Sequence, residues 1–347
     1  MQALILVGGE GTRLRPLTSL MPKPIVPLVD RPFMAFMLEW LARHGVDDVI
    51  MSCGFLATQV RDVLGDGSAY GVRLRFVEEP EPRGTAGALK YAEEFLQERF
   101  LMLNGDVLSD MDLSAQIAEH ERNGARATLA LVAVEDPSPY GLVRQNADDS
   151  VREFVEKPTA DQIDTNFISA GAYVLERDVV DMIPPDRNVS IEREIWPELV
   201  GAGLFAYQHD AYWLDIGKPE TYLQATYDIL GRAVETSVSA PDGIVIGSGC
   251  AIAADTVVGP LSVLGDGVVV GAGSRVERSV VLAGATIGDG CVISDSVVGP
   301  RARVGDRSVV AENAVLGEAV TLGADNVLAR GVRIFPGAGI GDGAIKF

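Results

Sequence analysis

The sequence predicts two domains, an α/β domain followed by a parallel β-helix. Three observations support this prediction: a six-residue repeat toward the C-terminal end, strand-like segments that alternate with helix-like segments before it, and a glycine-rich turn directly after the first strand. We expect the α/β domain to span residues 1–235 and the β-helix to span residues 243–347, with a linker at about residues 236–242.

The repeat places an aliphatic residue at every sixth position, with two slips of one residue, and glycine follows many of these positions. A period of six indicates a parallel β-helix, in which the aliphatic side chains point into a triangular core and three repeats close one coil. A glycine-rich β-sandwich is the alternative, but hairpin turns would not keep one phase for so long. The repeat therefore predicts a scaffold of about five to six coils. Its anchors are Ile246, Ile252, Val258, Leu264, Val270, Val276, Val281, Ile287, Ile293, Val298, Val304, Val310, Leu316, Leu322, Leu328, Ile334 and Ile340.

Short aliphatic runs alternate with amphipathic segments in the first 235 residues. This order predicts a Rossmann-like, mostly parallel sheet with helices on both faces. In such sheets ligands bind beyond the carboxyl ends of the strands, so candidate functional residues should follow the strands directly. The predicted strands cover residues 3–7, 48–53, 100–103 and 127–134, and the predicted helices cover residues 32–43, 85–98 and 112–123.

The net charge of −20 argues against non-specific binding to nucleic acids, which requires a basic surface. A phosphorylated ligand would need cations placed at its own site. The first 31 residues supply them, with four Lys or Arg residues against two carboxylates.

Cys53, Cys250 and Cys291 are dispersed and have no metal-site spacing, so we expect free thiols in a reducing compartment. The first residues do not resemble a signal peptide, and no stretch approaches the roughly 20 apolar residues of a membrane span. We therefore expect a soluble cytoplasmic protein that does not bind membranes.

The glycine-rich turn after the first strand contains Gly8, Gly9 and Gly11, and Arg13 and Lys23 follow it. Glycines let a phosphate approach the backbone N–H groups closely, and the two cations add positive charge. The turn is neither a Walker loop nor the dinucleotide fingerprint, whose third glycine is replaced here by a leucine. A simple tight turn is the alternative, but the two cations favour a phosphate site.

Two carboxylates are candidate Mg²⁺ ligands. Asp106 follows the strand at residues 100–103, and Asp215 lies in an apolar segment where an unpartnered charge would be costly. Two carboxylates that hold one Mg²⁺ against substrate phosphates are common in nucleotidyl transfer. The alternative for Asp106 is a carboxylate that only caps its turn.

Lys157 precedes Pro158, as Lys23 precedes Pro24. Proline stiffens the backbone and helps to aim the neighbouring side chain, so the two lysines suggest two phosphate subsites, one for a nucleotide and one for a phosphorylated acceptor. An exposed charge at a strand end is the alternative for Lys157.

Glu79 is a candidate for base recognition because one carboxylate can accept from both N1–H and the 2-amino group of guanine. Thymine and uracil offer a single N–H between two carbonyl groups. The alternative is that Glu78 and Glu79 are solvated glutamates at a strand end.

Together these residues resemble the sugar-1-phosphate nucleotidyltransferase family, and most closely its mannose-1-phosphate guanylyltransferases with a left-handed β-helix tail. The resemblance covers essentially the whole chain. Its motifs are GGEGTRLRPLT at residues 8–18, PKP at 22–24, GTAGAL at 84–89, NGDVL at 104–108, PYG at 139–141, VEKP at 155–158, SIEREIWP at 190–197 and YWLDIGKPE at 212–220.

The resemblance implies a Mg²⁺-dependent reaction between a nucleoside triphosphate, here GTP, and a hexose 1-phosphate, here mannose 1-phosphate, that yields a nucleotide sugar and pyrophosphate. It implies that Arg13 and Lys23 stabilise the triphosphate and that Asp106 and Asp215 bind Mg²⁺. The residues expected to contact the nucleotide are Val7, Gly8, Gly9, Gly11, Thr12, Glu79, Gly84 and Thr85. Those expected to contact the sugar phosphate are Gly141, Glu156, Lys157 and Ser169.

One departure from the family leaves the hexose open. Ser169 stands where the family usually has an asparagine that contacts the sugar. Glucose 1-phosphate with dTTP or UTP is therefore the alternative substrate pair.

Two alternatives of other classes also follow from the architecture. A non-catalytic regulatory subunit would be expected to have lost the charged site residues that are present here. A β-helix acyltransferase would need a histidine, but His44, His120 and His209 all precede the repeat. We expect the β-helix to mediate homo-oligomer formation instead, with residues 332–336 and 345–347 as candidates to cover its last coil.

Overall fold

The computed structural model describes residues 1–54 and 56–347, and these form two compact units. The first, here called the sheet unit, comprises Met1–Gly9 and Met34–Trp213. The second, the β-helix unit, comprises Glu10–Phe33 and Leu214–Phe347. We call Glu10–Phe33 the signature loop. The chain thus leaves the first unit in the middle of the glycine-rich turn, and Arg13 and Lys23 belong to the same unit as the β-helix.

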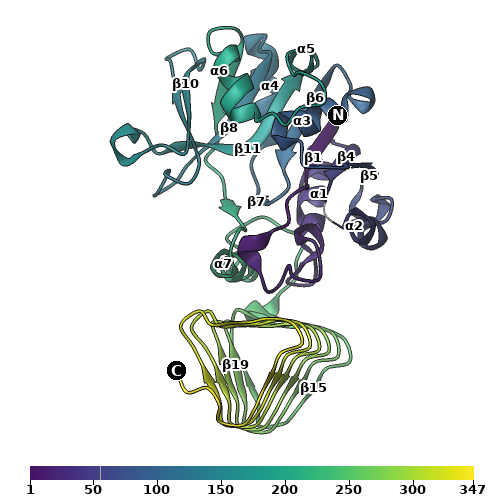
Figure 1. Ribbon diagram of the computed structural model, residues 1–347, viewed down its shortest axis with the longest axis vertical. Helices are drawn as coiled ribbons and strands as arrows, with labels where there is room; N and C mark the ends of the chain where they lie inside the picture. The colour runs from purple at the N-terminus through teal and green to yellow at the C-terminus, as the bar shows by residue number, and fades with distance from the viewer. Residues whose placement is uncertain (55) are drawn as a thin grey trace. The chain divides into compact units, whose positions relative to one another are not determined.

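A nine-stranded sheet forms the sheet unit, with the strand order β10-β9-β11-β6-β1-β4-β5 and with β8 paired to β11 and β12 (Figure 1). The central strands β6, β1, β4 and β5 are parallel, which confirms the α/β prediction. The strands are β1 (Gln2–Leu6), β4 (Asp48–Cys53), β5 (Arg73–Glu78), β6 (Arg99–Asn104), β8 (Ala127–Ala133), β9 (Gly141–Gln145), β10 (Val151–Glu156), β11 (Phe167–Glu176) and β12 (Leu204–Gln208), and the short β7 (Val107–Ser109) lies outside this sheet.

The other part of the sheet differs from a purely parallel arrangement. Strand β11 runs antiparallel to β6, β8 and β9, and β9 and β10 form an antiparallel hairpin. Antiparallel neighbours need only short connections, and β9, β10 and β11 are joined by turns and one short 3₁₀ helix, Ala160–Gln162, without an α-helix between them. This mixed half holds the residues expected to contact the sugar phosphate.

The three predicted helices of the sheet unit are present, at Phe33–Arg43, Gly84–Tyr91 and Leu113–Asn123, whereas those at Ala57–Leu64, Asp178–Asp181 and Trp196–Leu199 were not predicted. The predicted helix at residues 85–98 is shorter, because an α-helix ends at Tyr91 and a 3₁₀ turn follows at Glu93–Phe95. The side chain of Asp112 accepts from the amide of Ala115 and so caps the helix that follows it. The helices are α1 (Phe33–Arg43), α2 (Ala57–Leu64), α3 (Gly84–Tyr91), α4 (Leu113–Asn123), α5 (Asp178–Asp181) and α6 (Trp196–Leu199), with a π-helical turn, η6 (Ile191–Ile195), before α6.

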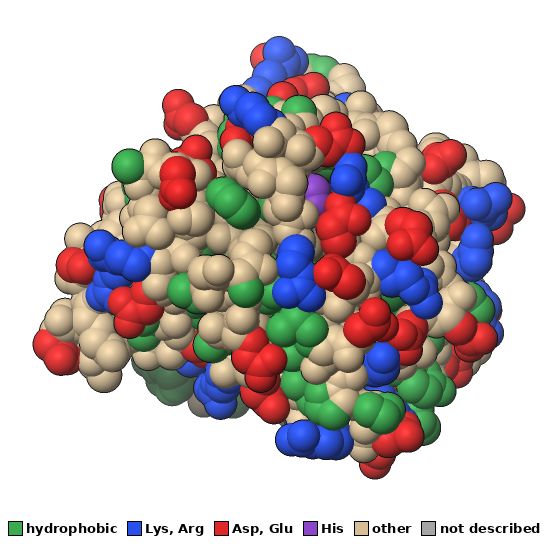
Figure 2. Space-filling view, turned by 90° about the horizontal axis from the view of Figure 1, so that it is seen from above, with side chains coloured by type: hydrophobic (Ala, Val, Ile, Leu, Met, Phe, Trp, Pro, Cys, Tyr) green, Lys and Arg blue, Asp and Glu red, His purple; other side chains and the backbone are tan. Residues whose placement is uncertain are grey.

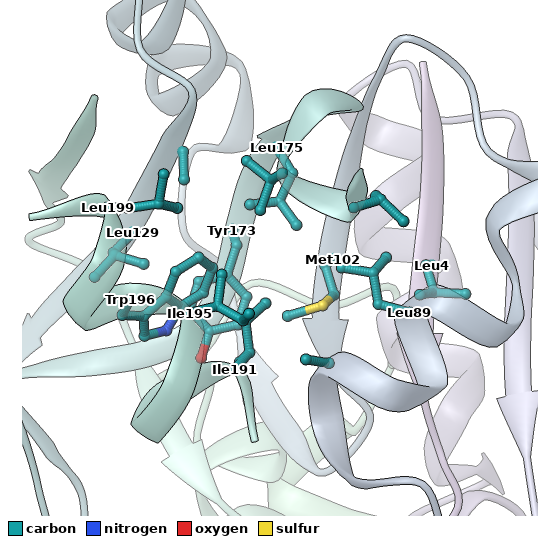
Figure 3. Packing of buried hydrophobic residues seen from close by; sticks show 14 of the residues in the cluster. Leu4, Leu89, Met102, Leu129, Tyr173, Leu175, Ile191, Ile195, Trp196 and Leu199 are labelled. Carbon is teal, nitrogen blue, oxygen red and sulfur yellow. The ribbon is translucent and has the colours of Figure 1, made fainter. Parts of the chain in front are cut away.

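Helix α3, η6 and α6 pack on one face of this sheet (Figure 3). Trp196 is fully buried there, and its ring lies 5.2 Å from that of Tyr173 on β11. Leu89 of α3, Met102 of β6 and Leu129 of β8 belong to the same cluster. Because β6 ends just before Asp106 and β11 contains Ser169, this core fixes the backbone that carries these two candidate residues.

The β-helix unit contains three parallel sheets, which are drawn as a triangle of stacked coils in Figure 1. The first face consists of β14 (Ile244–Ile246), β17 (Ser262–Leu264), β20 (Val280–Val281), β23 (Val297–Val298), β26 (Val315–Leu316) and β29 (Arg333–Ile334). The second consists of β15 (Ala251–Ile252), β18 (Val269–Val270), β21 (Thr286–Ile287), β24 (Arg303–Val304), β27 (Thr321–Leu322) and β30 (Gly339–Ile340). The third consists of β16 (Val257–Val258), β19 (Arg275–Glu277), β22 (Val292–Ser294), β25 (Val309–Val310) and β28 (Val327–Leu328).

These sheets confirm the six-residue repeat and are consistent with a left-handed β-helix. The anchors from Leu264 to Leu328 are buried in one continuous core, whereas Ile246 in the first coil is half exposed. The predicted slips occur where Leu264 pairs with Val281 and Val281 pairs with Val298. In a coil that is one residue shorter, the anchor thus still pairs with the anchor of the next coil.

The C-terminal segment extends the last coil. The amide of Val327 donates to the carbonyl of Ile345, and the amide of Ala329 donates to that of Phe347, so residues 345–347 cover the edge of β28 as expected. Phe335, in the other segment expected to cover the coil, is half exposed.

The remaining elements lie near the junction of the two units along the chain. They are β2 (Pro27–Leu28) and β3 (Arg31–Pro32) in the signature loop, β13 (Trp213–Asp215), and α7 (Pro219–Leu230) before the β-helix. None of the described helices is both long and apolar enough to cross a membrane. The cytoplasmic location stays a prediction.

Burial of His209 should make the protein less stable in mild acid. Burial lowers the pKa of His209 to about 4, against a small opposing effect of Asp112 and a reinforcing effect of His44. The unfolded chain then binds more protons than the folded chain between about pH 6.5 and pH 4, so stability falls as the pH falls through that window. We expect a loss of about 2 kcal/mol in the free energy of unfolding between pH 7 and pH 5 from this residue alone.

Urea denaturation of the wild type and of His209→Gln at both pH values measures this effect. The variant should show a flatter pH dependence, with a residual slope of the same sign from His120, whose pKa burial also lowers. Equal slopes in the two proteins would contradict the prediction.

Candidate active site

The sheet unit brings the start of the glycine-rich turn next to Glu79. The amide of Val7 donates to the carbonyl of Ser52 at 2.9 Å, which extends the pairing of β1 beyond its last strand residue. Oε1 of Glu79 accepts from the Ser52 hydroxyl at 2.7 Å and lies 3.6 Å from the position of a side chain on Gly8. Glu79 therefore faces the turn.

Glu78 and Glu79 have different surroundings. Glu78 forms an exposed ion pair with Arg61 at 2.6 Å, as the solvated alternative describes. Glu79 is only partly exposed and accepts from a buried serine. The base-recognition hypothesis therefore concerns Glu79 alone.

The rest of the turn is folded tightly in the β-helix unit. Gly11 has a left-handed backbone (φ +61°), and its carbonyl accepts from the hydroxyl of Thr18 at 2.7 Å. A side chain on Gly11 would approach Cβ of Lys23 to 3.3 Å. Thr12 begins a 3₁₀ turn, Thr12–Leu14, in which the amide of Leu14 donates to the carbonyl of Gly11. Lys23 is thus held against the turn, as the phosphate-site prediction requires.

Arg13 lies between Asp215 and Gly217. Its Nη2 is 3.8 Å from Oδ2 of Asp215, whose side chain is 17% exposed, whereas that of Arg13 is 61% exposed. A side chain on Gly217 would come within 2.9 Å of the guanidinium, so a glycine is needed for the arginine to lie there. The partly buried carboxylate of Asp215 thus orients a guanidinium that is mostly accessible to solvent. This contact was not predicted, because Arg13 and Asp215 are far apart in the sequence.

Lys23 is only 8% exposed. Its Nζ lies 6.0 Å from the centre of the Phe33 ring, and the surrounding pocket also includes Leu14, Ile216 and Tyr222. A lysine held next to a glycine-rich turn is a candidate for anion binding, because the free backbone N–H groups of such a turn and the positive charge can act on the same anion.

In the sheet unit, Asp106 follows the carboxyl end of β6. The preceding residue, Gly105, donates its amide to the carbonyl of Leu6 at 2.9 Å, which ties the end of β6 to the end of β1. Asp106 thus follows a backbone segment that is bonded to the end of β1, just before the glycine-rich turn, and it is partly buried.

Gly84 and Thr85 at the start of α3 contact the segment before η6. The carbonyl of Val189 accepts from the amides of Ala86 and Gly87 and lies 2.5 Å from the position of a side chain on Gly84. The Thr85 hydroxyl donates to Glu192 and accepts from the amide of Ile191, each at 2.8 Å. Both residues therefore fix the geometry of this helix end, and their contact with a nucleotide stays a prediction.

The residues expected to contact the sugar phosphate lie in the mixed half of the sheet. Gly141 lies under the ring of Phe154, and the hydroxyl of Ser169 donates to the Tyr173 hydroxyl at 3.1 Å. Lys157 has a left-handed backbone (φ +53°), and its amide donates to the carbonyl of Tyr140 at 3.0 Å. A bulky residue adopts this conformation only at a cost, and such strain is often found at functional sites.

Glu156 and Glu192 form an acidic pair that the sequence did not reveal. Burial raises the pKa of Glu156, and the negative charge of Glu192 raises it further, while Lys157 and Arg193 oppose both effects. Glu192 also accepts from the hydroxyl of Ser190 at 2.7 Å. The motif at residues 190–197 pointed to this segment, but only the folded structure brings Glu192 close to Glu156.

The donor set fits a divalent metal that keeps substrate or water ligands. Among residues 1–54 and 56–347, no three His, Cys, Asp or Glu side chains come together in a group that could hold a metal. Mg²⁺ is commonly held by one or two carboxylates together with phosphates and waters, and Asp106 and Asp215 are partly buried carboxylates suited to that role. Their joint binding of one ion stays a prediction.

Across the face drawn in Figure 2, Lys and Arg side chains are scattered among Asp and Glu side chains. With a net charge of −20, the prediction that Arg13, Lys23 and Lys157 act as individual phosphate-binding cations stays a prediction.

Comparison with known proteins identifies the family. The sequence matches the nucleotidyl transferase family over residues 2–232 and the GMPPB C-terminal domain over residues 241–344. Mannose-1-phosphate guanylyltransferase of Mycobacterium tuberculosis is 36% identical over 82% of this chain and 80% of its own length. Mannose-1-phosphate guanyltransferase of Yarrowia lipolytica is 41% identical over 65% of this chain and 63% of its own length.

A relative with another substrate pair and a solved structure are also similar. The UTP–glucose-1-phosphate uridylyltransferase of Synechocystis is 34% identical over 68% of this chain and 65% of its own length. The crystal structure of HddC from Yersinia pseudotuberculosis complexed with GMP-PN has a TM-score of 0.57 and 31% identity, and it covers 65% of this chain and 97% of that one. The chain therefore belongs to the nucleotidyl transferase family and carries a β-helix domain of the GMPPB C-terminal type.

Proposed function

We propose that the protein transfers GMP from GTP to mannose 1-phosphate and releases pyrophosphate, with Mg²⁺ as cofactor. The observation that carries the proposal is the arrangement of the signature loop, in which the glycine turn, the buried Lys23 and the Asp215-bound Arg13 are packed together. The similarity to mannose-1-phosphate guanylyltransferases supports the choice of substrates.

The reaction needs no nucleophilic side chain because the acceptor is itself a phosphate anion. An oxygen of the sugar phosphate attacks the α-phosphorus, and the bond to the β-phosphate breaks, so that pyrophosphate leaves with the negative charge. The protein must align the two substrates and neutralise the charge that develops on the leaving group. We assign the second task to Arg13 and Lys23 and the first to Lys157.

Mg²⁺, held by Asp106 and Asp215, would supply further positive charge against the triphosphate. Glu156 and Gly141 would contact the sugar.

We also propose a division of tasks along the chain. Residues 1–235 act as the catalytic domain, and a linker at about residues 236–242 connects it to a separate β-helix. This β-helix mediates homo-oligomer formation. Light scattering that detects only monomer at micromolar concentration would contradict the last point.

A substrate panel tests the proposal. Pyrophosphate release is measured with GTP, dTTP, UTP, ATP and CTP, each combined with mannose 1-phosphate and with glucose 1-phosphate. GTP with mannose 1-phosphate should give the highest kcat/KM. Preference for UTP or dTTP with glucose 1-phosphate would instead support the alternative substrate pair, and the absence of turnover with every pair would support a regulatory subunit.

Glu79→Gln should reduce the selectivity for guanine. If the Glu79 carboxylate accepts from both N1–H and the 2-amino group, wild type should prefer GTP over ITP, which lacks that amino group, by about 10-fold or more. The variant has one acceptor oxygen fewer and should lose most of this preference. Measurement of kcat/KM for GTP and ITP decides the point.

Glu78→Gln is the matched control, because Glu78 is the neighbouring glutamate in an exposed ion pair. It should keep the wild-type ratio. A wild type that does not distinguish GTP from ITP would show that Glu79 does not read the base.

A further inference from the structure

One face of the β-helix has buried side chains on its outer side. Val263, Val280, Val297 and Val315 occupy equivalent positions in successive strands of the first face, and all four are at most 1% exposed. Their neighbours along each strand are core anchors, and side chains alternate along a strand, so these valines point out of the coil. Equivalent valines on the other faces are far more exposed, with Val257 at 49%.

The signature loop is one of the segments that lie on this part of the β-helix. A shallow pocket is lined on one side by loop residues and on the other by a row of residues that follow the strands of the first face. The loop residues are Pro16, Leu17, Leu20, Met21, Val26 and Pro27, and the β-helix residues are Leu282, Pro300, Glu318 and Pro336.

In the last strand of the first face, an arginine replaces the outward-facing valine. Arg333 pairs in register with Val315. Its Nη1 donates to the carbonyls of Arg13 at 3.1 Å and Arg15 at 3.3 Å, and its Nη2 lies 3.6 Å from Glu220 at the start of α7. One guanidinium thus bridges the backbone of the signature loop and α7.

These contacts act on the residue that carries the positive charge of the loop. Arg333 binds the backbone carbonyl of Arg13, while Asp215 pairs with the Arg13 guanidinium. Hydrogen bonds from a charged donor are stronger than neutral ones, and the planar guanidinium can serve two carbonyls at once. A shift of about 1 Å in a positioned group can cost on the order of 100-fold in rate.

We propose that Arg333 is a positioning residue for Arg13, so that the last coils of the β-helix set the conformation of the signature loop. This inference rests on the proposed nucleotidyl transfer for its kinetic consequence. It gives the β-helix a direct role in the chemistry in addition to assembly.

Arg333→Met tests the proposal, with Arg303→Met as the matched control. Arg303 is also the first residue of a two-residue strand in the β-helix, but it lies on the second face and is exposed. We expect Arg333→Met to lower kcat by about 10-fold or more with little change in Tm. Arg333→Lys should recover only part of the rate, because an ammonium lacks the planar fork. Arg303→Met should match the wild type.

A double-mutant cycle separates positioning from a general structural effect. If Arg333 acts through Arg13, then Arg333→Met should have no further effect in an Arg13→Met background, whereas independent effects would multiply. Multiplicative effects, or wild-type kcat in Arg333→Met, would overturn the proposal.

Hydrogen exchange tests the anchoring without relying on activity. The amides of Leu14 and Arg15 donate to carbonyls within the loop, and their exchange should become several-fold faster in Arg333→Met but not in Arg303→Met. If no substrate pair is turned over by the wild type, the proposed function fails while this measurement still decides whether Arg333 anchors the loop. Unchanged exchange would reject the anchoring.

Discussion

Asp215→Asn should lower kcat by about 100-fold or more while the protein stays folded. The Asp215 side chain is 17% exposed and lies beside the Arg13 guanidinium. Asparagine preserves its shape but removes the negative charge that orients Arg13 and that we propose binds Mg²⁺. The exposed Asp242 has a left-handed backbone that asparagine tolerates well, so Asp242→Asn is a suitable control and should match the wild type.

A Mg²⁺ titration of Asp215→Asn separates the two roles of this carboxylate. Loss of a metal ligand should raise the Mg²⁺ concentration for half-maximal activity by about 10-fold or more. Loss of the Arg13 partner alone should lower kcat at an unchanged Mg²⁺ requirement. Near-normal turnover in the folded variant would remove Asp215 from the site altogether.

Lys23→Met should lower kcat by a similar factor, about 100-fold, while the protein stays folded. Methionine keeps an apolar stem among Leu14, Phe33 and Tyr222 but removes the positive charge. Thermal unfolding and pyrophosphate release are measured on the same sample, so that a loss of activity can be told from a loss of fold.

The control for this prediction is Lys90→Met, which removes a lysine of the sheet unit that is also largely buried, pairs with Glu93 and donates to the carbonyl of Val180. Its kcat should stay close to that of the wild type. If Lys23→Met kept its turnover to within about threefold, Lys23 would serve the packing of the loop and not the chemistry.

The β-helix was predictable from the sequence because its signal is local and repeated. Each anchor from Leu264 to Leu328 contacts its neighbours in the adjacent coils, so the six-residue period alone determines the core, including the two slips. The central parallel strands were predictable for a similar reason, since apolar runs alternated with helical segments. The antiparallel pairing of β11 was not, because it joins segments that are far apart in the sequence, such as Ala172 and Leu103.

The site was predictable at the level of its members but not of their contacts. The glycine turn and the Lys–Pro pairs are short motifs whose chemistry can be recognised in the sequence. The contact of Arg13 with Asp215 joins residues about two hundred positions apart, and that of Arg333 with the signature loop joins residues 318 and 320 positions apart. Such long-range contacts form only when the whole chain folds, and no periodicity or spacing in the sequence predicts them. The proximity of Glu192 to Glu156 was not predicted for the same reason, because it depends on how η6 packs against β10 and β11.

The position of Arg333 in its stack also limits how the β-helix can change in length. Adjacent strands are about 4.8 Å apart, so removal of one complete coil between Val263 and Arg333 would displace the guanidinium by that distance relative to the signature loop. A hydrogen bond cannot stretch so far. The number of coils between Val263 and Arg333 therefore has to match the position of the signature loop, although the individual coils look interchangeable in the sequence.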